Sequence, residues 1–99
     1  NSNNKSINVE FIQNLVASYF NLNIQEMLSP RRSRALARPR QIAVYLAKQH
    51  TTNSLPDIGR KFSNRDHTTV IHAVKKIDEL IKKDNEIRQN VIEIKKKFL

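Results

Sequence analysis

Residues 55–76 read LPDIGRKFSNRDHTTVIHAVKK. The apolar residues of the first half of this stretch recur at helical spacing, so they lie on one face of a helix. A second apolar stripe at helical spacing starts at Val70. The polar residues 63–65 between the two stripes indicate a turn. The second helix opens with residues 66–69, DHTT, whose side chains are too short to fill a core. This layout predicts a helix-turn-helix whose second helix presents its polar tip to a groove of DNA.

The composition of the chain is strongly basic. Its 99 residues suffice for one domain with a single modest core. The 18 Lys and Arg residues against 9 Asp and Glu give a formal charge of +9, which favours nucleic acid or an anionic membrane as partner. The absence of cysteine excludes disulfides and thiolate metal sites, and a single glycine excludes the glycine-rich loops that bind nucleotide phosphates.

Apolar periodicity predicts an all-α fold of about six helices over residues 7–99, with residues 1–6 as a linker remnant. We expect Ser29 to Arg38 to form a loop and Pro39 to lie in the first turn of the helix that follows. Four residues are predicted to cap the N-termini of helices, namely Asn8, Ser54, Asp66 and Asp84.

The basic residues gather in one part of the chain. From Met27 to Pro56 there is no Asp or Glu. A merely solvated loop usually mixes both signs, so this pattern favours an anion-binding surface. Arginine also suits phosphate and narrow minor grooves, so a basic loop ahead of the helix-turn-helix could lie along the minor groove. The basic residues of this window are Arg31, Arg32, Arg34, Arg38, Arg40 and Lys48.

Other functions fit the residues less well. Asp66 could be only a helix cap and His67 only a surface histidine, although a carboxylate can cap an amide and accept from cytosine N4 together. His67 and His72 are about 140° apart around a helix, which is unsuitable for shared metal binding. The helix from Asn8 to Asn21 lacks the Lys and Arg of a membrane-surface helix. A protein-interaction bundle would need more than one short zipper-like helix at the end of the chain. We predict neither a metal site nor an enzyme active site here.

Three motifs in the chain resemble the DnaA family of bacterial chromosomal replication initiators. They are RDHTTVIHA at 65–73, RRSR with ARPRQ within 31–41, and SLPDIG at 54–59. The resemblance extends from about Ile7 onward and implies the C-terminal DNA-binding domain, with a helix-turn-helix fold similar to that of the Trp repressor. It also implies an AAA+ ATPase module before Asn1 that would hold ATP or ADP with Mg²⁺, so we expect no cofactor in this chain.

The resemblance implies a function in initiating and regulating bacterial chromosomal replication. The implied target is the DnaA box, a duplex site resembling TTATCCACA at the replication origin. The domain is expected to be a monomer without a membrane site, acting in the cytoplasm on the nucleoid. The alternative from the residues alone is a helical module that binds nucleic acid through charge, without sequence preference.

The resemblance also assigns roles to particular residues. It places Arg32 in the minor groove and four residues on base edges in the major groove, namely Pro56, Asp66, His67 and Thr68. It gives phosphate contacts to Arg40, Gln41, Lys48, Thr69 and Lys76, and it makes Arg31, Arg34 and Arg38 further candidate DNA contacts. The chain departs from the family at Ser63 and Asn64, where two glycines are common, and at Pro30, where a basic residue is common.

Overall fold

The computed structural model describes residues 7–29 and 34–98, except for the side chain of Arg34. Within these ranges the chain forms six α-helices and no strand, as the all-α prediction requires. The predicted linker remnant, residues 1–6, lies outside the described residues. The helices are α1 (Val9–Tyr19), α2 (Ile24–Leu28), α3 (Arg34–His50), α4 (Leu55–Lys61), α5 (His67–Lys83) and α6 (Asn85–Lys95).

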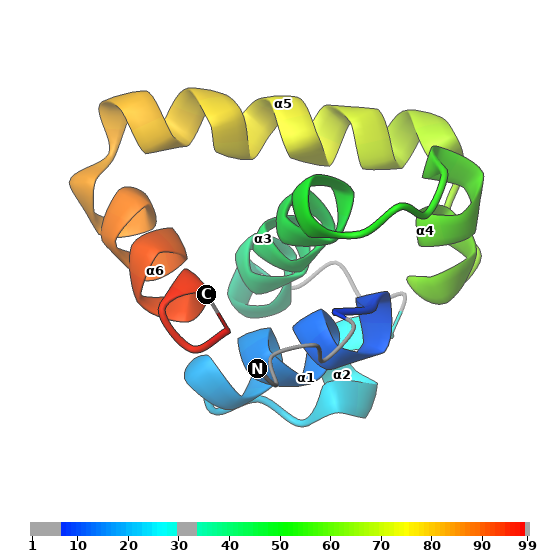
Figure 1. The fold of residues 1–99 in the computed structure, drawn as a ribbon, viewed down its shortest axis with the longest axis horizontal. Coiled ribbons are helices and arrows are strands. Elements are labelled where there is room, and N and C mark those ends of the chain that lie inside the picture. Colours follow the sequence, from blue (N-terminus) through cyan, green and yellow to red (C-terminus); the bar gives the residue numbers. More distant parts are fainter. Residues whose placement is uncertain (1–6, 30–33, 99) are drawn as a thin grey trace, which may run out of the picture.

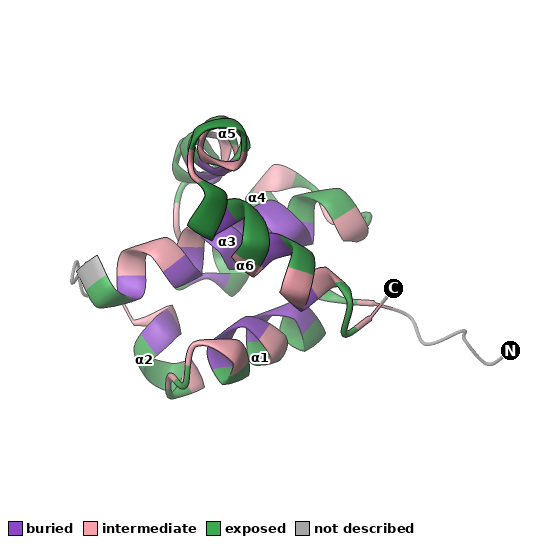
Figure 2. Ribbon diagram, turned by 90° about the vertical axis from the view of Figure 1, so that its left-hand side faces the viewer, coloured by how far each residue is buried: buried purple, intermediate pink, exposed green. Residues whose placement is uncertain are grey.

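Helix α3 lies at the centre of the molecule (Figure 1). The long helix α5 crosses one side of α3, α1 and α2 cover the opposite side, and α6 runs back from the end of α5 toward α1. Every residue from Ile42 to Ala47 in α3 is buried, so this helix is surrounded rather than amphipathic there (Figure 2). Its neighbours each bury one apolar stripe against it, and for α5 that stripe is Val70, Ala73 and Ile77.

Three of the predicted helix caps are present. The Asn8 side-chain oxygen accepts a hydrogen bond from the Phe11 amide at 2.8 Å, and the Ser54 hydroxyl accepts one from the Asp57 amide at 3.3 Å. Asp84 is both the C-cap residue of α5 and the N-cap residue of α6, and its carboxylate accepts a hydrogen bond from the Glu86 amide at 2.9 Å. These bonds satisfy amides that a helix leaves without partners in its first turn.

The prediction of a loop from Ser29 to Arg38 is wrong at its end. Helix α3 begins at Arg34, so Pro39 lies inside the helix and not in its first turn. A proline inside a helix costs about 3 kcal/mol. Burial of Leu36, which is 7% exposed, and of Pro39 itself offsets this cost. Local sequence rules place the helix start at the proline because they do not include this burial.

Helix α1 holds the end of α4 in place. The buried side chain of Gln13 donates to the Lys61 carbonyl at 2.9 Å, and the Lys61 ammonium lies 2.7 Å from the Glu10 carboxylate. The hydrogen bond from Lys61 lowers the pKa of Glu10. At the other end of α1, the Tyr19 hydroxyl donates to the Asn90 side chain of α6 at 3.1 Å. None of the helices in the described ranges has the length and apolar content to span a membrane.

Candidate nucleic-acid interface

The turn between α4 and α5 contains two consecutive residues in the left-handed backbone region. Ser63 has a φ of 67° and Asn64 a φ of 55°. Asn adopts this region with little cost, whereas Ser does so less readily. The Ser63 hydroxyl donates to the Leu28 carbonyl at the end of α2, so a tertiary hydrogen bond accompanies the strained residue. The turn therefore forms at the two positions where glycines are common in the DnaA family.

The sole glycine of the chain is in contact with the backbone of this turn. A Cβ atom on Gly59 would lie 2.2 Å from the Arg65 carbonyl oxygen. This distance is too short for any side chain at position 59. The Arg65 amide donates to the Gly59 carbonyl at 2.8 Å and the Asn64 amide to the Arg60 carbonyl at 3.2 Å. Glycine is required because the turn folds back directly onto α4.

The polar tip of α5 is exposed. Asp66 is the N-cap residue by position, but in the described structure its side chain makes no capping hydrogen bond. This corrects the prediction that the Asp66 carboxylate caps the helix. One carboxylate oxygen instead lies 3.2 Å from His67 Nδ1, and the side chains are 68% and 56% exposed. Thr68 is exposed beside them. The tip therefore presents a carboxylate, an imidazole and a hydroxyl to solvent.

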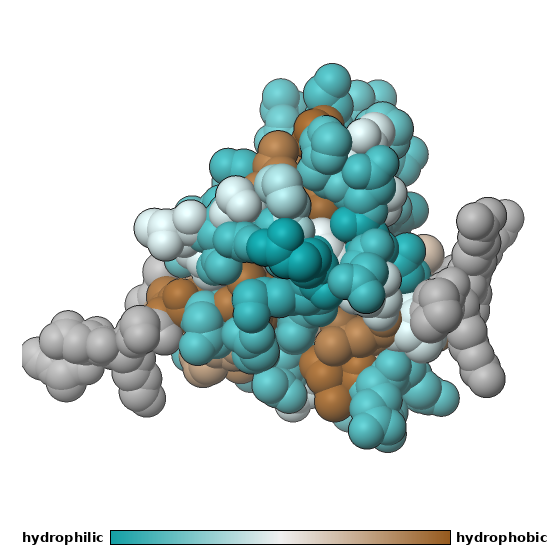
Figure 3. Space-filling model, turned by 90° about the vertical axis from the view of Figure 1, so that its right-hand side faces the viewer, coloured by the Kyte–Doolittle hydropathy of each residue, from teal (hydrophilic) through white to brown (hydrophobic). Residues whose placement is uncertain are grey.

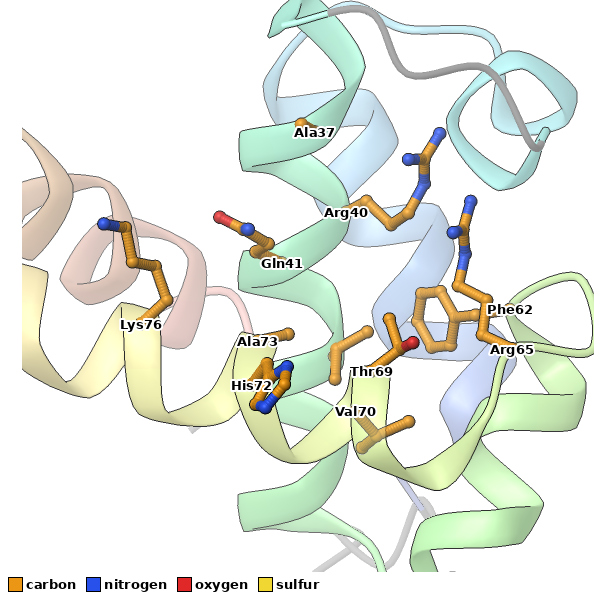
Figure 4. A pocket seen from close by; sticks show the side chains of 11 residues that line it. Ala37, Arg40, Gln41, Phe62, Arg65, Thr69, Val70, His72, Ala73 and Lys76 are labelled. Atoms are coloured by element: carbon orange, nitrogen blue, oxygen red, sulfur yellow. The ribbon is translucent and has the colours of Figure 1, made fainter.

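A hollow of about 360 Å³ lies between α3, α5 and the turn (Figure 4). Among the described residues, those that line it include no Asp or Glu. Thr69 and Lys76 come from α5, and Gln41 lies opposite them on α3. The full lining is Ala37, Arg40, Gln41, Val44, Phe62, Arg65, Thr69, Val70, His72, Ala73 and Lys76. A cationic hollow of this kind suits an anion such as a phosphate.

The α3 side of the hollow is tied together by arginine side chains. Arg38 donates to the Gln41 side-chain oxygen at 2.7 Å. Arg40 is only 8% exposed, and its Nε and Nη2 donate at 2.8 Å each to the carbonyls of Met27 and Ser29. Burial, and then the charge of Arg65, lower the pKa of Arg40. Arg65 Nη2 donates to the same Ser29 carbonyl at 3.1 Å.

The structure brings some of the predicted site residues together and leaves others apart. Four of the five predicted phosphate contacts line the hollow, namely Arg40, Gln41, Thr69 and Lys76. Lys48 is exposed near the end of α3, and Pro56 is exposed at the start of α4. Arg31 and Arg32 lie outside the described residues, and Arg34 begins α3.

Two polar residues of the hollow are given no DNA contact in the sequence analysis. Arg65 and His72 both line it, and Arg65 also contacts the end of α2. A general sequence signal for Arg65 does exist, since helix ends leave carbonyls that need donors and an arginine in a turn can supply one. Its partner at Ser29 lies far away in the chain, so no local pattern could identify it.

The face that carries α4 and the start of α5 is largely hydrophilic, apart from an apolar patch near its lower edge (Figure 3). A compact helical core, a tight turn and an exposed polar helix tip together define a helix-turn-helix domain of the DNA-binding class. The family model described as the bacterial dnaA protein helix-turn-helix matches residues 9–77. The chain therefore belongs to this family.

Proteins named chromosomal replication initiator protein DnaA are similar to the chain. The protein of Wolbachia pipientis wMel is 53% identical over 97 residues, which cover 98% of this chain and 21% of that protein. The protein of Rickettsia bellii (strain OSU 85-389) is 53% identical over 90 residues, which cover 91% of this chain and 19% of that protein. The chain thus spans about one fifth of the length of these relatives.

A crystal structure of a DNA replication initiation factor has a similar fold. It aligns with a TM-score of 0.75 at 30% sequence identity, and the alignment covers 92% of this chain and 29% of that one. The alignment covers more of this chain than the family model, which ends at Ile77.

Proposed function

We propose that this domain binds DnaA boxes, duplex sites resembling TTATCCACA, and thereby serves the initiation and regulation of bacterial chromosomal replication. The observation that carries the proposal is the exposed tip of α5, where the Asp66 carboxylate is not used as a helix cap. A carboxylate held at the N-terminus of a recognition helix can accept from cytosine N4 in the major groove.

In the proposed complex α5 enters the major groove. Asp66, His67 and Thr68 meet base edges there, and Pro56 at the start of α4 contacts a thymine methyl. Arg32 enters the adjacent minor groove, where arginine recognises the narrow A·T-rich form. Arg31, Arg34 and Arg38 are further candidate DNA contacts.

The phosphate contacts come from both sides of the hollow. Thr69 and Lys76 on α5 and Gln41 on α3 line the same acid-free space, so one strand of the backbone can reach all three. Lys48 adds an exposed charge farther along α3. These contacts supply affinity that does not depend on sequence.

The proposal places the domain in the bacterial cytoplasm, on the nucleoid, as a monomer when it is isolated from the rest of the protein. ATP or ADP with Mg²⁺ would bind to an AAA+ module of the whole protein, and the domain itself would carry no cofactor or catalytic role. Its contribution would be to select the site at which the whole protein acts.

Binding to two duplexes of equal length, one with a box and one with the same bases scrambled, tests the proposal. At about 150 mM salt we expect the box to bind about 10³-fold more tightly or better, because specific sites exceed non-specific ones by this much. Equal affinity for both, with a steep salt dependence, would instead make the domain a charge-driven nucleic-acid-binding module.

A further inference from the structure

The end of α2 is held by side chains from the helix-turn-helix and from α3. Its last carbonyls, those of Met27, Leu28 and Ser29, accept from Arg40, Ser63 and Arg65. A helix leaves its final carbonyls without partners inside the helix, and they favour cationic donors. Here the donors come from three positions that are distant from α2 in sequence.

We propose that Arg40, Ser63 and Arg65 form a positioning clamp that fixes the turn between α4 and α5 relative to the end of α2. The proposal rests on the proposed function. Arg31 and Arg32 follow Ser29 after a single proline in the sequence. If the segment that holds them enters the minor groove and α5 the major groove, the clamp sets the distance between the two points of recognition. Arg40 then acts through the end of α2 instead of binding a phosphate itself.

The geometry supports positioning over direct contact for the two arginines. Both guanidinium groups share one acceptor, the Ser29 carbonyl, at 2.8 and 3.1 Å. Two cations repel each other, so their convergence is favourable only where a common acceptor and the end of a helix attract both. Arginine presents several donors in a rigid fork and can hold such an arrangement, whereas lysine presents a single flexible ammonium.

Substitutions that keep the charge separate positioning from phosphate binding. We expect Arg65→Lys and Arg40→Lys to reduce the preference for the box over the scrambled duplex about tenfold, the scale for losing a hydrogen bond from a charged group. The salt slope on the scrambled duplex should remain that of the wild type. Arg60→Lys is the matched control, since Arg60 is exposed and pairs with Asp57 on its own helix.

Glycine substitutions in the turn provide a second pair without any change in charge. Ser63→Gly and Asn64→Gly both relieve a left-handed residue, but only Ser63→Gly removes a hydrogen bond to α2. We expect the preference for the box to fall in Ser63→Gly and to stay unchanged in Asn64→Gly. This pair decides the question if an arginine variant fails to fold, as judged by circular dichroism.

Three results would overturn the clamp. The first is an unchanged preference for the box in folded Arg65→Lys and Arg40→Lys. The second is an equal effect of the two glycine substitutions on that preference. The third is a salt slope that falls by about one unit in Arg65→Gln while the preference for the box stays unchanged. The last result would make Arg65 a phosphate ligand. If the wild-type protein itself shows no preference, the proposed function fails.

The clamp can also be tested in the free protein without DNA. It predicts that the Arg40 Nε–H proton, which donates to Met27, exchanges with water faster in Arg65→Lys than in the wild type. Unchanged exchange in this variant would contradict the clamp independently of any DNA measurement.

Discussion

Single residues at the helix-turn-helix divide into those that hold the fold and those left exposed to solvent. Asp66 and Asp84 are both N-cap residues by position, but only the Asp84 carboxylate accepts hydrogen bonds from amides of the helix that it caps. The same residue type at the same kind of position is therefore structural in one case and available for a ligand in the other. The sequence could not separate the two, because both match the capping pattern equally well.

This contrast predicts opposite effects for two alanine substitutions. Asp84→Ala should cost about 1 kcal/mol of stability, because two amides at the start of α6 lose their acceptor, and should leave box binding unchanged. Asp66→Ala should relax the choice at one base pair by about 1–3 kcal/mol, with a smaller loss of stability.

Urea unfolding combined with binding to boxes altered at each base pair measures both effects. Each variant serves as the control for the other. Asp66 would be a structural cap if Asp66→Ala destabilised the protein as much as Asp84→Ala and left every base-pair preference intact.

At the level of elements, the angle between α4 and α5 depends on how closely the turn returns to α4. Gly59 allows the Arg65 carbonyl to lie where a side chain would otherwise be. The left-handed backbone conformations of Ser63 and Asn64 reverse the direction of the chain. The helix-turn-helix was predictable because its apolar spacing and turn residues are adjacent in the sequence. The early start of α3 was not, because it depends on the burial of Leu36 in the folded molecule.

Gly59→Ala should be strongly destabilising. The new methyl group would meet a backbone carbonyl that cannot move without opening the turn, and overpacking of this kind costs about 1–3 kcal/mol. Thermal unfolding measures the loss, and Arg60→Ala on the same helix controls for a change at an exposed position, because its surface ion pair with Asp57 contributes little to stability. A melting temperature that stays within error of the wild type would show that α5 can shift to accept the methyl group.

At the scale of the whole molecule, the charges are unequally placed. The acid-free stretch from Met27 to Pro56 supplies one wall of the hollow, whereas five of the nine acidic residues lie from Asp78 to Glu93, on α5, on α6 and at the cap between them. A field of this shape would orient the domain with α3 and the start of α5 toward a polyanion before contact. Composition alone favours an anionic partner, and the fold predicts the side of the domain that such a partner would approach.

The salt dependence of binding should report which lysines touch phosphate. Lys48→Ala and Lys76→Ala should each lower the slope of log affinity against log salt by about one unit, equally for box and scrambled duplexes. Lys82→Ala, at the opposite end of α5 from the recognition tip, is the control and should leave the slope unchanged. Equal slopes in all three variants would remove Lys48 and Lys76 from the phosphate contacts.

The hydrogen bond between Tyr19 and Asn90 links the first helix to the last across most of the chain. Together with the burial of Ile87, Val91 and Ile94, it makes α6 part of the same core that supports the turn between α4 and α5. Folding of this domain must therefore close a long loop before its full stability appears, although most of its helical contacts are local. We expect one cooperative transition for the whole domain. A chain shortened to the region that the family model matches would lose this closing contact and unfold at milder conditions.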